Sequence, residues 1–156
     1  MPAPFNDIRL NPFRSDRRMF SGCVATATGI KYGMVVIGDT ATTNARDVKL
    51  PTAAGSVGVR GVVSDQGDPN ASDAFAVGDE FACCIDGTVE VLLASGQIAT
   101  KDAPAITAAA GGAVKPLGAE AKPFDVVGTF AETRDNSGGA TAVLVSLNVR
   151  PYREFA

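Results

Sequence analysis

The sequence predicts an all-β protein: a small β-barrel, β-tulip-like or sandwich domain with an extended N-terminal arm. Valine is its commonest branched aliphatic residue, which favours strands. Short apolar runs alternate with turn-forming residues at a spacing of about eight to twelve residues, as in barrels and sandwiches. No segment has a strong helical periodicity. A chain of 156 residues is expected to form one domain.

Residues 1–22 are predicted to be an extended arm. Pro2, Pro4 and Pro12 favour extended backbone in this segment. The segment is also richer in large apolar side chains than a free disordered tail. We therefore expect it to become ordered against a surface. Its apolar and basic residues are Phe5, Ile8, Leu10, Phe13, Phe20, Arg9, Arg14, Arg17 and Arg18.

The domain at residues 23–149 is predicted to begin with three short strands. Residues 23–28 alternate in polarity and end at Gly29, and residues 34–37 end at Gly38. Residues 57–64 are rich in valine and precede a loop, DQGDPNASD, that is dense in turn-forming residues. A strand–turn–strand order of this kind is typical of antiparallel sheets.

The sequence FACCI-DG-TVEVLL predicts a β-hairpin with its turn at Asp86-Gly87, because a type I′ turn needs two residues that tolerate positive φ. Residues of a hairpin that are paired across the strands share a face. Both faces would be largely apolar, so we expect the hairpin to be buried on both sides. One face would hold Ala82, Cys84, Val89, Val91 and Leu93, and the other Phe81, Cys83, Ile85, Glu90 and Leu92.

The C-terminal third predicts two further strands and a tail. Residues 106–110 could form a helical turn because of their alanines, but Thr107 and the following glycine pair argue against a longer helix. Strands are expected at 124–131 and 141–149, joined by the loop ETRDNSGGA. Residues 150–156 form a C-terminal tail in which Arg150, Tyr152 and Phe155 are candidates for contacts between subunits.

Residue chemistry does not indicate an enzyme. The chain has no histidine, which excludes Ser-His-Asp and Cys-His catalysis and histidine-ligated zinc. Cys23, Cys83 and Cys84 contain no C-x-x-C motif and are predicted to be small apolar core residues, with a reactive thiol as the alternative. We therefore predict no catalytic residue, no metal and no cofactor.

Charge and hydropathy limit the expected partners. The first twenty residues carry four arginines against two aspartates, whereas the body is acidic. Nucleic-acid binding needs a concentrated basic face, so we expect no nucleic-acid partner. No apolar run is long enough for a membrane span or a secretory signal, which predicts no membrane partner and synthesis in the cytoplasm. Two readings stay open for the basic ends: arms that dock on an acidic surface, or solvated tails.

The order of these pieces resembles the capsid decoration (cement) proteins of tailed bacteriophages. The resemblance covers roughly residues 33–149 and rests on two runs. The first starts at GMVVIGD, continues through GVRGVVSD and ends in the VGDEFACCIDGTVEVLL run. The second starts at ITAAAGGAVKPL and ends in FDVVGTFAETRDNSGGATAVLVSLNV. The arm and the tail lie outside it.

The resemblance implies a non-enzymatic cement protein on the outer surface of the phage head, made in the host cytoplasm. It would bind the major capsid protein and bridge neighbouring capsid subunits. It would also bind copies of itself, with a homotrimer as the first choice and a homodimer as the second. We expect the arm to supply the capsid contacts, because buried aromatic and basic anchors usually dominate such interfaces. The alternative is another phage virion module, such as a head–tail joining, tail or fibre-associated domain.

Overall fold

The computed structural model describes residues 18–63, 74–109, 111–121, 123–138 and 141–151. Within these ranges the chain is all-β, which confirms the predicted fold class. The strands are β1 (Arg18–Ala25), β2 (Val35–Gly38), β3 (Asp47–Lys49), β4 (Val59–Val63), β5 (Glu80–Leu93), β6 (Ile98–Ala99), β7 (Pro104–Thr107), β8 (Val114–Pro116), β9 (Asp125–Phe130), β10 (Arg134–Asp135) and β11 (Thr141–Pro151).

Five strands close into a barrel in the order β1-β3-β2-β4-β5, with β5 pairing back to β1. The β1–β3 pair is parallel and the other four pairs are antiparallel. Closure matters because each strand of a closed barrel has a neighbour on both sides, which leaves no long edge open to non-native pairing.

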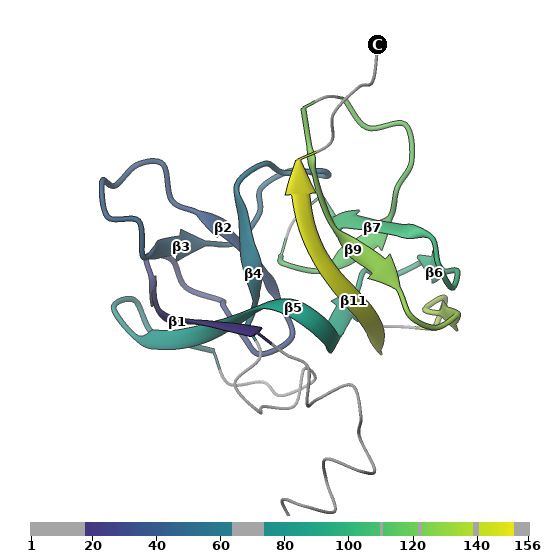
Figure 1. The fold of residues 1–156 in the computed structure, drawn as a ribbon, viewed down its shortest axis with the longest axis horizontal. Helices are drawn as coiled ribbons and strands as arrows, with labels where there is room; N and C mark the ends of the chain where they lie inside the picture. Colours follow the sequence, from purple (N-terminus) through teal and green to yellow (C-terminus); the bar gives the residue numbers. More distant parts are fainter. Residues whose placement is uncertain (1–17, 64–73, 110, 122, 139–140, 152–156) are drawn as a thin grey trace, which may run out of the picture.

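The pairings also close a second circuit, in the order β5-β11-β9-β7-β8, which returns to β5 where Leu93 pairs with Val114. The 14-residue strand β5 therefore belongs to both circuits. Figure 1 shows β5 in teal, running from the lobe that holds β1 to β4 towards the lobe that holds β7, β9 and β11. The short strands β6 and β10 form a separate two-stranded sheet.

The predicted hairpin at Asp86-Gly87 is wrong, because β5 continues through both residues. Asp86 and Gly87 pair with Asn148 and Leu147 of β11 instead of forming a turn. Gly87 does have a positive φ of 96°, but this bends one strand. The bend explains why Cys84 and Val89, five positions apart, both lie in one apolar cluster although a regular strand would put them on opposite faces.

Two main apolar clusters fill the molecule, and β2 and β4 separate them. Val36 and Val63 face the inside of the first barrel, whereas their neighbours Val35 and Val62 face the second cluster. Adjacent residues on a strand point to opposite faces, so this wall is buried on both sides. The first barrel is filled by Cys23, Ala25, Ile30, Val36, Val48, Val63, Phe81 and Cys83.

Most predicted strands are confirmed with shifted bounds. The prediction at 23–28 overlaps β1, and those at 34–37, 57–64, 124–131 and 141–149 overlap β2, β4, β9 and β11. Residues 104–107 form strand β7 where the alanines suggested a helical turn. The sequence analysis did not predict β3, β6, β8 and β10, which have three residues or fewer.

Candidate functional site

The structure locates three of the predicted site residues. Arg18 and Phe20 lie on β1, where they pair with Asp86 and Cys83 of β5. Arg150 lies on β11, opposite Val126 of β9. Residues 18–22, assigned above to the arm, therefore belong to a barrel strand. The other predicted residues lie outside the described residues: Phe5, Ile8, Arg9, Leu10, Phe13, Arg14, Arg17, Tyr152 and Phe155.

The register brings the first and the last strand to one position of β5, which we call the junction. The junction consists of Asp86 and its two pairing partners, Arg18 of β1 and Asn148 of β11. These partners flank Asp86, so their backbones lie two strand spacings apart, about 10 Å. Both strands run antiparallel to β5. The start of β1 and the last part of β11 therefore lie at the same level of β5.

Arg46 secures β1, the strand that contains the last residues of the predicted arm. It lies in the exposed loop before β3, and its Nε donates a hydrogen bond to the carbonyl of Gly22 in β1. Its Nη2 pairs with Oε1 of Glu80 at 2.7 Å, at the start of β5. A Cβ on Gly22 would lie 2.9 Å from this Nη2, so the guanidinium needs the glycine to reach its place. One side chain thus joins β1, β5 and the β3 loop.

Asp39 organises the loop at the end of β2. The Thr26 hydroxyl donates to its Oδ2 at 2.6 Å, the Ala41 amide donates to its Oδ1 at 3.0 Å, and Lys49 Nζ lies 3.5 Å away. The pKa of Asp39 is lowered, first by the Thr26 hydrogen bond and then by the Ala41 amide, with Lys49 adding to the effect. These contacts connect β2 to β3 and to the residue after β1.

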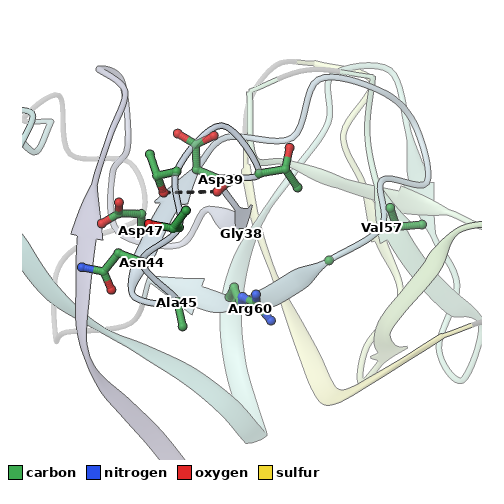
Figure 2. Close-up of a pocket in the computed structure, with 11 residues that line it drawn as sticks. Gly38, Asp39, Asn44, Ala45, Asp47, Val57 and Arg60 are labelled. Carbon is green, nitrogen blue, oxygen red and sulfur yellow. Dashed lines mark hydrogen bonds between the residues drawn. The ribbon is translucent and has the colours of Figure 1, made fainter.

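A pocket of about 310 Å³ adjoins this loop. Figure 2 shows it between the segment of Asp39, Asn44 and Asp47 and the segment of Val57 and Arg60. The Asp39 carboxylate is already held by three partners, and the Asn44 side chain accepts the Arg46 amide. These two side chains of the pocket lining thus hold the loop itself together.

Cys23 and Cys83 lie side by side in the first barrel. Both are fully buried, and the Cys83 thiol donates to the Cys23 sulfur at 3.2 Å. This hydrogen bond lowers the pKa of Cys23, against the effect of burial and with help from Arg46 and Arg60. The same hydrogen bond, with burial, raises the pKa of Cys83. Cys84 is buried in the other cluster, which confirms that Cys83 and Cys84 face opposite sides of the strand.

The described ranges contain neither a cluster of metal ligands nor a membrane-spanning helix. Among these residues no group of three or more His, Cys, Asp or Glu side chains is placed to hold a metal ion. Nor do these ranges contain a helix with the length and hydropathy to cross a membrane.

Comparisons of the chain with protein-family models, with curated proteins and with solved structures found no match. The family resemblance therefore rests on the order of sequence motifs alone. Sequence reasoning missed the pairs Arg46–Glu80 and Cys23–Cys83, whose members are 34 and 60 residues apart. No local spacing in the sequence signals either pair, since both depend on the closure of the first barrel.

Proposed function

We propose that this protein is a phage head cement protein, which binds the outside of the capsid and bridges neighbouring major capsid subunits without catalysis. The structural observation that carries this proposal is the junction. It holds the chain that follows the predicted arm and the chain that precedes the predicted tail against one position of β5. We propose that the segments beyond these two strands reach two different neighbours.

Strand β1 attaches the arm to the barrel. Residues 18–24 of β1 pair with β5, and Arg46 adds contacts to Gly22 and Glu80. A pull on residues 1–17 along the strand would load several of these hydrogen bonds together instead of one at a time. A closed barrel also keeps its strand edges paired, which suits a protein packed at high local concentration on a particle.

Binding would come from the arm's apolar and basic anchors, each buried aromatic residue contributing about 1–3 kcal/mol. We propose a homotrimer, with a homodimer as the second choice, because linked copies multiply weak contacts through effective concentration. Arg150, Tyr152 and Phe155 would then contact a neighbouring copy.

The proposal is tested by binding to purified heads that lack the protein. Deletion of residues 2–17 leaves β1 intact and should abolish head binding with an unchanged melting temperature. Two full-length double variants separate the contributions of the apolar and the basic anchors. The first is Phe5→Ser with Phe13→Ser, and the second is Arg9→Gln with Arg14→Gln. We expect the serine variant to lose most binding, and the glutamine variant to bind with reduced dependence on salt. Undiminished binding of the deletion would overturn the role of the arm.

Copy number distinguishes cement from a head–tail joining, tail or fibre-associated module. Cement covers the head and is present in many copies per particle, whereas the other modules are present in few. Gel densitometry of purified virions against the major capsid protein measures this ratio. A few copies per particle, or absence from the outer surface of filled heads, would overturn the proposed function.

A further inference from the structure

The sulfurs of Cys23 and Cys83 lie close to each other inside the first barrel. The two sulfurs are 3.2 Å apart, and formation of a bond of about 2.05 Å requires them to move about 1 Å closer. The residues lie on adjacent antiparallel strands: Cys23 pairs with Phe81, and Cys83 is two positions further along β5. Such diagonal neighbours on one face can touch through their side chains. Both are free thiols in this structure.

We propose that Cys23 and Cys83 form an oxidative cross-linking site, at which a peroxide joins their sulfurs in a disulfide between β1 and β5. This inference does not depend on attachment to a capsid. Cys23 sulfur, as thiolate, attacks one peroxide oxygen, so the O–O bond breaks and Cys23 becomes a sulfenic acid. Cys83 sulfur then attacks the Cys23 sulfur, and the hydroxyl leaves as water. The two thiols lose two electrons and two protons, and hydrogen peroxide becomes two waters.

The order of the two steps follows from the asymmetry of the pair. Cys23 accepts the hydrogen bond and has Arg46 and Arg60 nearby, which lowers its pKa and favours its thiolate. Cys83 is the donor, and its pKa is raised. Cys23 is therefore the thiol that reacts with the oxidant, and Cys83 the one that resolves the sulfenic acid.

Access for a small oxidant comes through local opening of β1. The β1–β5 ladder has register shifts between Arg18 and Met19 and between Phe20 and Cys23. Within the described residues, β1 pairs with β3 only at Val24 and Ala25. The segment that covers the sulfurs thus depends on an interrupted ladder with β5, and such segments open at lower free energy than a continuous core.

The test compares the native full-length protein with Cys84→Ala and Cys23→Ala. After exposure to hydrogen peroxide, we expect the intact mass of wild type and Cys84→Ala to fall by two hydrogens, and that of Cys23→Ala to show no such loss. Peptide mapping should link the segment of Cys23 to that of Cys83. Cys84 is the matched control because it is equally buried on the opposite face of β5. If Cys23→Ala does not fold, Cys23→Ser replaces it.

Stability gives a second measurement. Oxidised wild type should unfold at higher urea concentration than the reduced protein, and a dithiol reductant should reverse the shift. The proposal is overturned by a link to Cys84, by a link between two chains, or by oxygen addition without loss of hydrogens. It is equally overturned if all three thiols persist in the native protein under peroxide that fully oxidises the same chain in urea.

Discussion

Arg46 and Glu80 form an ion pair of 2.7 Å that joins the loop before β3 to the first residue of β5. The same guanidinium donates a hydrogen bond to the Gly22 carbonyl, so Arg46 also contacts β1. Both side chains are about half exposed, at 46% and 64%, which limits the energy of the pair in water. Its effect is therefore expected on the local opening of β1 more than on global stability.

Replacement of Arg46 by methionine should reduce the free energy of unfolding by only about 0.5–1 kcal/mol but increase amide exchange across β1. Hydrogen–deuterium exchange with mass spectrometry measures this locally. Arg134→Met is the control, because Arg134 forms its ion pair, at 3.2 Å, with Glu132, which is only two residues away. Equal exchange in β1 for both variants would contradict the bridging role of Arg46.

Gly128 pairs with Leu147 where β9 lies beside β11. A Cβ at this position would clash with the backbone carbonyl of Ser146. Gly128→Ala should therefore destabilise the protein by about 1–3 kcal/mol, because two paired strands would have to separate. Gly138→Ala is the matched control, since a Cβ there meets nothing within 4 Å, and its effect should stay within about 0.5 kcal/mol. Urea unfolding of the two variants measures the difference.

Asn136 holds the end of β5 from a loop. Its Nδ2 donates to the carbonyls of Leu93 and Ala94, at 2.7 and 2.9 Å, and its side chain is buried. Asn136→Asp replaces the donor with a carboxylate that faces two carbonyls. We expect a loss of about 3 kcal/mol at neutral pH. Asn44→Asp should be tolerated, because exposed Asn44 uses Oδ1 to accept the Arg46 amide.

The pH dependence of Asn136→Asp has a definite sign. Burial against carbonyls raises the pKa of the new carboxyl group above that of the unfolded chain. The penalty is therefore small below the ordinary aspartate pKa and grows as the pH rises towards neutrality. Urea unfolding at acidic and neutral pH measures it. A loss of unfolding free energy that is larger at acidic pH would contradict this, because it would show that the new carboxylate accepts hydrogen bonds in the folded state.

Asp39 should give the wild-type protein a dependence of the opposite sign. Because the folded state lowers the pKa of Asp39, its contribution is present above the ordinary aspartate pKa and is lost as the pH falls through the lowered value. Thr26→Val removes the hydroxyl that is the largest cause, and should flatten the fall of stability between about pH 5 and pH 2. Asp39→Asn should flatten this pH dependence further. The double variant Asp39→Asn with Thr26→Val should have nearly the same dependence of stability on pH as Asp39→Asn alone.

The sequence predicted much of the strand content because valine runs and turn residues are local signals. The Asp86-Gly87 error shows where local signals fail. Glycine does take a positive φ there, as a turn would require, but partners from β1 and β11 keep the chain extended. Four of the five residues predicted to share a face, Cys84, Val89, Val91 and Leu93, nevertheless lie in one cluster, whereas Ala82 does not. A bend at Gly87 and a hairpin turn both bring these four residues to the same side.

The candidate site was less predictable than the fold. Most of the residues chosen for it lie in segments 1–17 and 152–156, outside the described residues. The contacts that the structure adds, from Arg46 to Glu80 and from Cys83 to Cys23, join residues that sequence periodicity does not relate. They depend on which strands become neighbours in the closed barrel, and that pairing is a property of the whole chain.

Gly87 lies in β5, the strand shared by the first barrel and the second circuit. Its replacement should therefore reduce the stability of both. Its φ of 96° strains an L-residue by about 1–2 kcal/mol, and relaxation would disturb the pairing of Gly87 with Leu147. Gly78 is the matched control, because its φ of 93° is similar but lies in the turn before β5, where a Cβ meets nothing within 4 Å. Gly87→Ala should therefore destabilise more than Gly78→Ala in urea and speed amide exchange in β4 and β11 together. Faster exchange in only one of these strands would mean that the two circuits unfold independently.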